Sequence, residues 1–172
     1  FKKMSDPSVA DLDRFDWPDP HDPGRFRGLR ERARALHEGT DFAIVLTIGI
    51  GPVHISQFLR GWTEYMEDLV ERPAFAEALM DHVVDFWVAV TERALAEAGE
   101  FVDIVVFLDD VGGQRAPLMR PEMYRRMIKP RHRRLVESGK RHGKRVLWHT
   151  CGSVYALIPD LIDIGIDALN PV

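Results

Sequence analysis

Apolar residues in this chain form short uninterrupted runs, and the segments between these runs carry the spacing of amphipathic helices. The runs at 42–48 and 102–108 are rich in β-branched and aromatic residues and show no polar alternation, apart from Asp103. Such runs are typical of strands that are covered on both faces, so we expect two buried strands here. Shorter apolar runs predict two further strands, at 146–149 and 166–170.

Helical periodicity fills the intervals between the predicted strands. Apolar residues recur there at spacings of three and four, and Pro or Gly stands near several of the expected helix ends. The helices predicted in this way span 25–38, 53–70 as one or two short helices, 73–99, 155–164, and a segment that opens at Pro121 and that Pro130 kinks or splits. Strands that alternate with helices predict an α/β fold built from parallel βαβ units.

Two architectures fit this alternation, an open doubly wound sheet and part of a TIM (β/α)₈ barrel. The open sheet usually carries a glycine-rich phosphate-binding turn after its first strand, but Gly49-x-Gly51-Pro52 lacks the third glycine. A complete barrel needs about 250 residues, so four βα units in 172 residues correspond to roughly half of one. We therefore expect a partial (β/α)₈ barrel.

The beginning of the chain has a different character. Pro residues are concentrated over 5–24, a composition that disfavours both helix and strand. We predict a Pro-rich segment and a helix over 1–40, laid over the outside of a partial barrel at 41–172. The chain begins on Phe and stops directly after the last predicted strand, so we expect it to be a piece of a longer protein.

Composition narrows the classes of protein. Hydrophobic residues make up 45% of the chain, which excludes disorder for most of its length, and the longest apolar runs are far shorter than the roughly 18 to 20 residues of a membrane helix. A single Cys cannot form a disulfide within one chain, so we expect a reducing, cytoplasmic setting. Ten Lys or Arg fall within 125–145 without interleaved aromatic residues, so we expect no nucleic-acid partner. The short apolar runs predict no membrane contact either. A homo-oligomer is compatible with the sequence.

In either architecture ligands bind at the carboxyl ends of the strands, where His149-Thr150-Cys151 is the strongest candidate. Side chains two apart on a strand share a face, so His149 and Cys151 converge while Thr150 points away. An imidazole and a thiolate suit Zn²⁺, which needs three or four ligands, the others coming from Asp or Glu or from beyond Val172. The alternative is a satisfied histidine beside a Cys that packs as a small hydrophobe.

Asp109 and Asp110, which end the second predicted strand, form the next candidate. Carboxylates at such a position bind a cation, accept backbone N–H bonds or perform acid–base work. Alternatively, one of them caps the following turn and the other is solvated. His54, Gln114 and Asn170 also lie near expected strand ends. The remaining histidines are expected at the surface, on helices or in loops: His21, His37, His82, His132 and His142.

Five motifs then bear on a family resemblance. They are Asp109-Asp110-x-Gly112-x-Gln114, Pro121-Glu122-x-Tyr124, Lys129-Pro130-Arg131-His132, His149-x-Cys151-Gly152-Ser153-Val154, and the stretch over 157–171. Read together, they resemble the uroporphyrinogen decarboxylase superfamily, which includes the cobalamin-linked methyltransferases that make methyl-coenzyme M. The resemblance runs from about residue 11 to the end and is most specific from Asp109 onward. It implies a (β/α)₈ barrel with its active site in the mouth.

In the methyltransferase branch of that superfamily, a His-x-Cys pair and a later Cys hold zinc, which activates a thiol acceptor for attack on a corrinoid-bound methyl group. His149 and Cys151 match the first two of these ligands, and the third would lie past Val172. The resemblance therefore implies zinc, methylcobalamin carried by a partner corrinoid protein, and a small-molecule thiol acceptor. The predicted site residues are Asp109, Asp110 and Gln114 as catalytic, His54, Phe58 and Asn170 as substrate-binding, and His149 and Cys151 as metal ligands.

The decarboxylase branch implies a different chemistry, without metal or cofactor. There, arginines hold the carboxylates of a tetrapyrrole and an Asp stabilises the pyrrole ring, and these residues would lie outside this chain. Phe58 stands where that branch has a Tyr, which removes a hydroxyl from the pocket. We therefore predict a zinc-dependent, corrinoid-linked methyltransferase, with uroporphyrinogen decarboxylase as the alternative. A barrel that only binds a corrinoid or porphyrin is a third reading.

Overall fold

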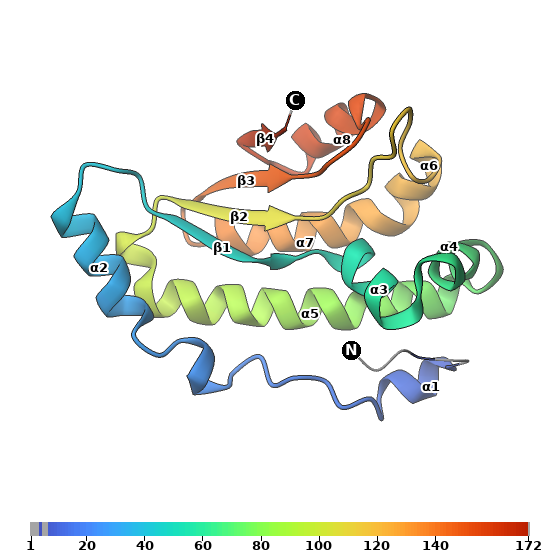
Figure 1. Cartoon of the computed structure of the whole chain (residues 1–172), viewed down its shortest axis with the longest axis horizontal. Helices are drawn as coiled ribbons and strands as arrows, with labels where there is room; N and C mark the ends of the chain where they lie inside the picture. Colours follow the sequence, from blue (N-terminus) through green and yellow to red (C-terminus); the bar gives the residue numbers. More distant parts are fainter. Residues whose placement is uncertain (1–3, 5–6, 172) are drawn as a thin grey trace.

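The computed structural model describes residues 4 and 7–171, and its centre is a sheet of four parallel strands (Figure 1). The strands are β1 (Val45–Ile50), β2 (Ile104–Leu108), β3 (Arg145–His149) and β4 (Ala168–Asn170). Their spatial order, β1-β2-β3-β4, is also their order along the chain. A doubly wound sheet reverses its order at a switch point, whereas a barrel adds each strand beside the last. The fold is α/β, part of a (β/α)₈ barrel.

Helices occupy the intervals that the periodicity predicts. The longer ones are α2 (Leu29–Gly39), α3 (Pro52–Arg60), α4 (Trp62–Glu71), α5 (Pro73–Ala98), α7 (Lys129–Lys140) and α8 (Ile158–Asp163). The short ones are α1 (Val9–Leu12), α6 (Pro121–Met123), η1 (Pro23–Arg25), η2 (Gly99–Phe101) and η4 (Tyr155–Leu157). Between α3 and α4 the chain turns at Gly61, whose φ of 108° suits glycine. Within the described residues, none of these helices has the length and apolar character to span a membrane.

Pro130 splits the helical segment that opens at Pro121. After α6, the chain makes a π-helical turn, η3 (Tyr124–Ile128), and α7 then begins at Lys129. The N–H of Lys129 donates to the carbonyl of Tyr124, five residues back. Pro130 has no N–H and its ring crowds the preceding turn, so a wider turn before it accommodates the ring.

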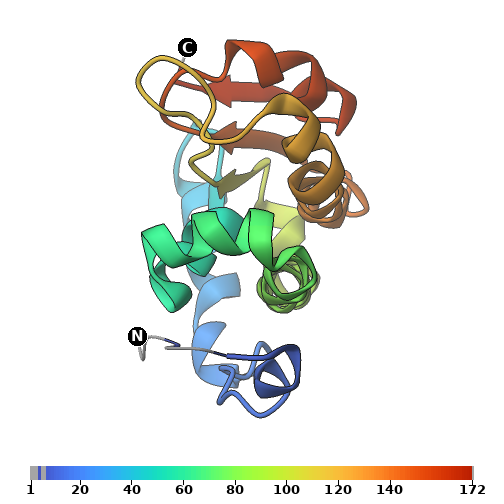
Figure 2. The same ribbon diagram turned by 90° about the vertical axis from the view of Figure 1, so that its right-hand side faces the viewer.

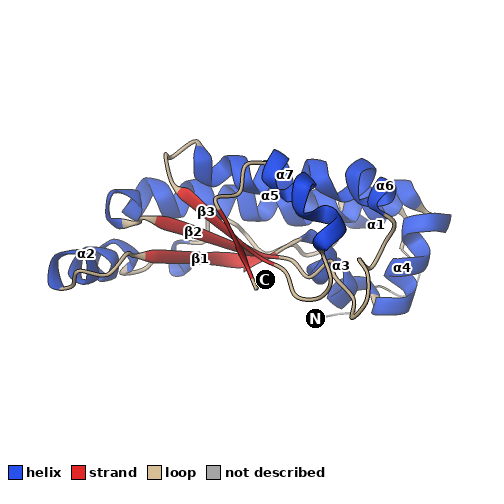
Figure 3. Ribbon diagram, turned by 90° about the horizontal axis from the view of Figure 1, so that it is seen from above, coloured by secondary structure: helices blue, strands red, loops and turns tan. Residues whose placement is uncertain are grey.

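The main hydrophobic core lies between the sheet and the helices α5 and α7, which run along the same face of it (Figure 3). Alternate residues of β2 and β3 point to this face and are buried: Val105, Phe107, Val146 and Trp148. The helices contribute Ala76, Met80, Val84, Leu135 and Val136 to the same core. Burial with a period of two thus identifies one covered face of the sheet.

The opposite face of the sheet is less covered by the described residues. Ile104, Val106 and Leu108 of β2 point there and are only partly buried, and Val45, which pairs with Ile104, is 51% exposed. The expectation that the strands are covered on both faces was therefore wrong for this face. The described helices pack on the other face, and in a (β/α)₈ barrel the uncovered one is turned toward the interior.

The first strand is also displaced from its predicted position. Phe42 is 81% exposed and lies before β1, whereas Gly49 and Ile50 belong to the strand. Ile44 precedes β1, and its N–H donates to the carboxylate of Asp103 at 2.7 Å. A side chain far along the chain thus takes the backbone group that a strand partner would otherwise bind, which the apolar pattern does not show.

Basic side chains of η3 and α7 form ion pairs with acidic side chains of α5 and α8. The pairs are Arg131–Asp81, Arg134–Asp85, Arg133–Asp163, Arg125–Asp160 and Lys129–Asp160. Arg133–Asp163 and Arg134–Asp85 are exposed, and such pairs contribute little each, about 0 to 1 kcal/mol. Arg131 and Asp160 are buried, so salt screens their pairs less. The joint effect of all these pairs is to align α7 between two neighbouring helices, so the basic run of the sequence has a role within the fold.

The N-terminal segment lies against α5, on the side away from the strands (Figure 2). Met4 and Leu12 are buried in a second core cluster with residues of α3 and α5. Trp17 stacks on the ring of His82, with ring centroids 5.0 Å apart. The expectation of a segment laid over the outside of the domain agrees with this arrangement, and the domain boundary at residue 40 stays a prediction.

We predict that Phe107→Ala lowers the free energy of unfolding by about 3 to 5 kcal/mol, because it empties a fully packed position between β2 and the helices. Phe42→Ala is the matched control, and we expect it to change that free energy by less than about 0.5 kcal/mol, because the side chain is exposed. Urea unfolding of both variants measures the difference. Equal effects of the two substitutions would contradict this description of the core.

Candidate metal centre

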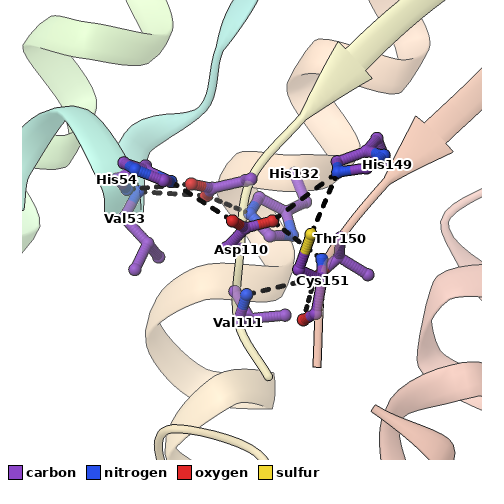
Figure 4. A network of polar contacts seen from close by, with 9 residues as sticks. Val53, His54, Asp110, Val111, His132, His149, Thr150 and Cys151 are labelled. Atoms are coloured by element: carbon purple, nitrogen blue, oxygen red, sulfur yellow. Dashed lines mark hydrogen bonds and ion pairs between the residues drawn. The ribbon is translucent and has the colours of Figure 1, made fainter. Parts of the chain in front are cut away.

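The carboxyl ends of β2 and β3 lie side by side (Figure 4), and β4 continues the same row of parallel strands. Asp110 follows β2, His149 is the last residue of β3, and Cys151 lies two residues beyond it. The strands are in register at this edge, since Leu108 pairs with His149 and His149 with Asn170. Strand register therefore brings together polar groups that are far apart in the sequence.

Asp110, His149 and Cys151 form a compact group of possible metal ligands. The Sγ atom of Cys151 lies 3.3 Å from Nε2 of His149, and that nitrogen lies 4.0 Å from Oδ1 of Asp110. One ligand atom from each residue falls within 4.8 Å of the others. Ligands about 2.0 to 2.3 Å from a tetrahedral zinc are roughly 3.3 to 3.8 Å apart, so this group is close to the required spacing.

Asn170 orients the imidazole of His149. Its Oδ1 atom lies 2.7 Å from Nδ1 of His149 and can only accept, so Nδ1 carries the proton. The lone pair of Nε2 is then directed toward Cys151 and Asp110. A hydrogen bond to the far nitrogen is how metal-binding histidines are usually held. Asn170 was predicted to bind substrate, and its contact in this structure is with a candidate ligand.

The thiol of Cys151 is exposed and has a raised pKa. The main cause is the negative charge of Asp110, followed by partial desolvation and by a hydrogen bond between the two side chains. The same carboxylate accepts the backbone N–H of Cys151 at 2.7 Å, which fixes the two residues side by side. A bound cation would offset both negative charges and favour the thiolate.

Two glycine loops cross next to Cys151 and hold it beside Asp110. Gly152 has a φ of 88°, and a Cβ atom there would lie 2.4 Å from the carbonyl group of Gly112. The N–H of Ser153 donates to the carbonyl of Gly113 at 2.7 Å, which ties the two loops together. Thr150 is buried and accepts the N–H of Val111, so it points away from the candidate site as predicted.

Asp109 lies on the buried side of the strand end and has no exposed surface. Its Oδ2 accepts the N–H of Val53 at 3.0 Å, and its Oδ1 accepts the N–H of His54 at 2.9 Å. The carboxylate thereby binds the free N–H groups of the first turn of α3. One member of the aspartate pair is thus a helix cap, although for α3 rather than for the following turn, and no atom of it is open to solvent.

The expectation that His132 lies at the surface was wrong. Its side chain is fully buried, with Nε2 2.8 Å from Oδ2 of Asp109 and Nδ1 3.2 Å from the hydroxyl of Tyr124. A signal for this position was available in the sequence. His132 falls three residues before Leu135 and four after Ile128, on the apolar side of the helix.

Of the other predicted site residues, His54 and Phe58 lie beside the candidate ligands and Gln114 does not bond to them. Nδ1 of His54 is 3.8 Å from Oδ2 of Asp110, and the His54 ring packs on Phe58 with centroids 4.9 Å apart. These two residues of α3 therefore form a wall beside Asp110. Gln114 is exposed in the loop after β2, and in the described part of the chain no hydrogen bond joins it to the group.

Two comparisons give this geometry a context. A family model described as uroporphyrinogen decarboxylase (URO-D) matches residues 2–171. Among solved structures, a methyltransferase from Methanosarcina mazei is similar, with a TM-score of 0.67 and 24% sequence identity. The similarity covers 84% of this chain and 41% of that one, so this chain spans less than half of that protein's length. Such a likeness shows the fold. A comparison with curated proteins finds no match.

We predict that Asp110→Asn accelerates alkylation of Cys151 by iodoacetamide in the metal-free protein. Removing the negative charge lowers the raised pKa of the thiol, so a larger fraction is thiolate at a pH of about 8. Cys151 is the single Cys of the chain, so the rate can be followed by mass spectrometry of the intact protein. Asp85→Asn, on the exposed side of α5, serves as control. An unchanged or slower rate in Asp110→Asn would contradict the assignment.

We also predict that Gly152→Ala destabilises the protein more than Gly143→Ala. Both glycines have positive φ, 88° and 72°, so both substitutions strain the backbone by about 1 to 2 kcal/mol. Only at Gly152 does the new Cβ meet another backbone segment, whereas nothing lies within 4 Å at Gly143. We expect about 1 to 3 kcal/mol of additional loss at Gly152, measured by urea unfolding. Equal losses of unfolding free energy would mean that the two loops move apart to accommodate the new Cβ atom, which would contradict the tight crossing.

Proposed function

The chain belongs to the uroporphyrinogen decarboxylase family, and on that premise we propose that it forms part of a zinc-dependent, corrinoid-linked methyltransferase that moves a methyl group to a thiol acceptor. The observation that carries the proposal is the convergence of Asp110, His149 and Cys151 at the carboxyl edge of the sheet. Metal-free decarboxylation of a tetrapyrrole does not need a thiol and an imidazole 3.3 Å apart.

The chemistry of the donor set fits zinc. Catalytic zinc sites use three protein ligands and leave the fourth position to water or substrate. In the proposal, His149 offers Nε2, Cys151 offers its thiolate, and Asp110 offers Oδ1 as a third ligand from within this chain. The family resemblance places the third ligand beyond Val172, and a ligand from there would replace Asp110 or join it. Bound zinc supplies Lewis acidity that lowers the pKa of a thiol acceptor at the open position.

The remaining residues of this chain prepare the site for that chemistry. Asn170 holds Nδ1–H of His149 so that Nε2 is free to bind a cation. The loop crossing at Gly152 keeps the thiol of Cys151 beside Asp110. His54 and Phe58 form the adjoining wall and would contact the acceptor. Since Cys151 is exposed, a partner corrinoid protein can bring its methyl group to the acceptor sulfur from the solvent side.

The second candidate is decarboxylation of tetrapyrrole acetate side chains, which the description of the family model favours. In this chain Phe58 occupies the place of a pocket Tyr, so a hydroxyl of the decarboxylase pocket is missing. The two candidates are separated by incubating the intact protein with uroporphyrinogen III. Formation of coproporphyrinogen would place decarboxylation first.

For the zinc site we predict about one bound zinc per chain in the intact protein, measured by elemental analysis after dialysis. Cys151→Ala and His149→Ala should each weaken zinc binding by more than about 100-fold, since they remove ligands rather than groups that orient ligands. His142→Ala is a matched control at the opposite end of β3, and it should bind zinc as the wild type does. Absence of stoichiometric zinc, or full zinc binding after Cys151→Ala, would contradict the proposal.

A further inference from the structure

One buried imidazole, that of His132, contacts the chain neighbours of the candidate ligands. Its Nε2 atom lies 2.8 Å from Oδ2 of Asp109, which directly precedes Asp110. Its ring packs on Trp148, which directly precedes His149, with ring centroids 4.4 Å apart. The same Asp109 carboxylate holds the backbone N–H of His54 at 2.9 Å. All of these contacts lie beneath the metal-ligand group, on the covered side of the sheet.

We propose that His132 is a positioning residue that sets the relative placement of Asp110, His149 and His54. The inference rests on the proposed zinc site, because it assigns to His132 the task of keeping the ligands at binding distance. His132 itself touches neither substrate nor metal, since its side chain is fully buried and its partners are Asp109, Tyr124 and Trp148. It acts through the residues that it holds.

The hydrogen bonds fix which nitrogen of His132 carries the proton. Oδ2 of Asp109 accepts the N–H of Val53 and lies 2.8 Å from Nε2 of His132, so we assign Nε2 as the donor of this bond. Nδ1 is then an acceptor and receives the hydroxyl proton of Tyr124. Burial raises the pKa of Tyr124, so the hydroxyl keeps the proton it donates. The chain of bonds thus runs in one direction from Tyr124 to Asp109.

An apolar residue at position 132 would fill the space without fixing the carboxylate. Asp109 would lose one of three donors in a buried place, where an unmet hydrogen bond is unfavourable because water cannot replace the lost donor. The carboxylate could then turn, and the ends of β2 and α3 that it joins would no longer be held at one spacing. Metal ligands must keep their positions to about 0.5 Å, so a small shift of Asp110 relative to His149 is enough to weaken binding.

The test compares His132→Leu with His132→Gln in the intact protein. Gln can place an N–H near the position of Nε2 and restore the bond to Asp109, whereas Leu fills a similar volume without a donor. We expect His132→Leu to weaken zinc binding by about 10- to 100-fold in competition with a chelator, and His132→Gln to recover most of the loss. The absorption spectrum of the Co²⁺-loaded protein should change in the Leu variant and return toward the wild-type spectrum in the Gln variant.

Controls separate positioning from loss of fold and from failure of the zinc site. His142→Leu and His142→Gln should leave zinc affinity unchanged, and circular dichroism should show the same helix content in all variants. If the wild type binds zinc and folded His132→Leu binds it equally well, the positioning role is wrong while the zinc site stands. If the wild type binds no zinc, the zinc proposal fails. Positioning is then judged from amide hydrogen exchange at Val53 and His54, and unchanged protection in His132→Leu would overturn it.

Discussion

The arrangement of the strand edge depends on the burial of one carboxylate. Asp109 is fully enclosed, and an ionised group in that position costs several kcal/mol unless donors surround it. Its donors come from the first turn of α3 and from α7, which are remote from each other in the sequence. The end of β2, the start of α3 and the first turn of α7 must therefore meet at this carboxylate. The candidate metal centre at the carboxyl ends of the strands depends on these three segments being joined.

Neighbouring residues at the strand ends have different roles, because successive side chains on a strand point to opposite faces of the sheet. Asp109, Trp148 and Thr150 are buried and anchor the backbone, and each is followed by a residue that is open to solvent. The same residue type can therefore have opposite roles at adjacent positions, as the aspartate pair shows. Asp109 is buried and has a structural role, whereas Asp110 is partly exposed beside His149 and Cys151. Each candidate ligand thus directly follows a residue that is fixed in the core.

The sequence predicts the elements and the fold class well, because periodicity and Pro or Gly positions are local signals. It also predicts that the side chains of His149 and Cys151 converge, since a spacing of two residues on a strand is local as well. Two features depend on contacts between distant segments and could not be predicted in this way, namely the choice between Asp109 and Asp110 and the partner of Asn170. The burial of His132 was missed although its spacing to Ile128 and Leu135 indicates the apolar side of the helix. The poor coverage of one face of the sheet could not be predicted either, since an apolar run does not show which elements pack on it.

The π-helical turn at 124–128 has a consequence for helical phase. Residues advance by about 100° each around an α-helix, so two residues eight positions apart would point about 80° away from each other. A turn that takes up one extra residue removes about 100° of that advance, which brings Tyr124 and His132 close to the same side. The hydrogen bond between them thus depends on the wide turn. A relative with one residue fewer in this turn would place the two side chains seven positions apart in an ordinary α-helix, about 20° from the same side, and would keep them aligned. The inserted residue and the wide turn therefore compensate each other, and either one without the other would turn the tyrosine away from the histidine.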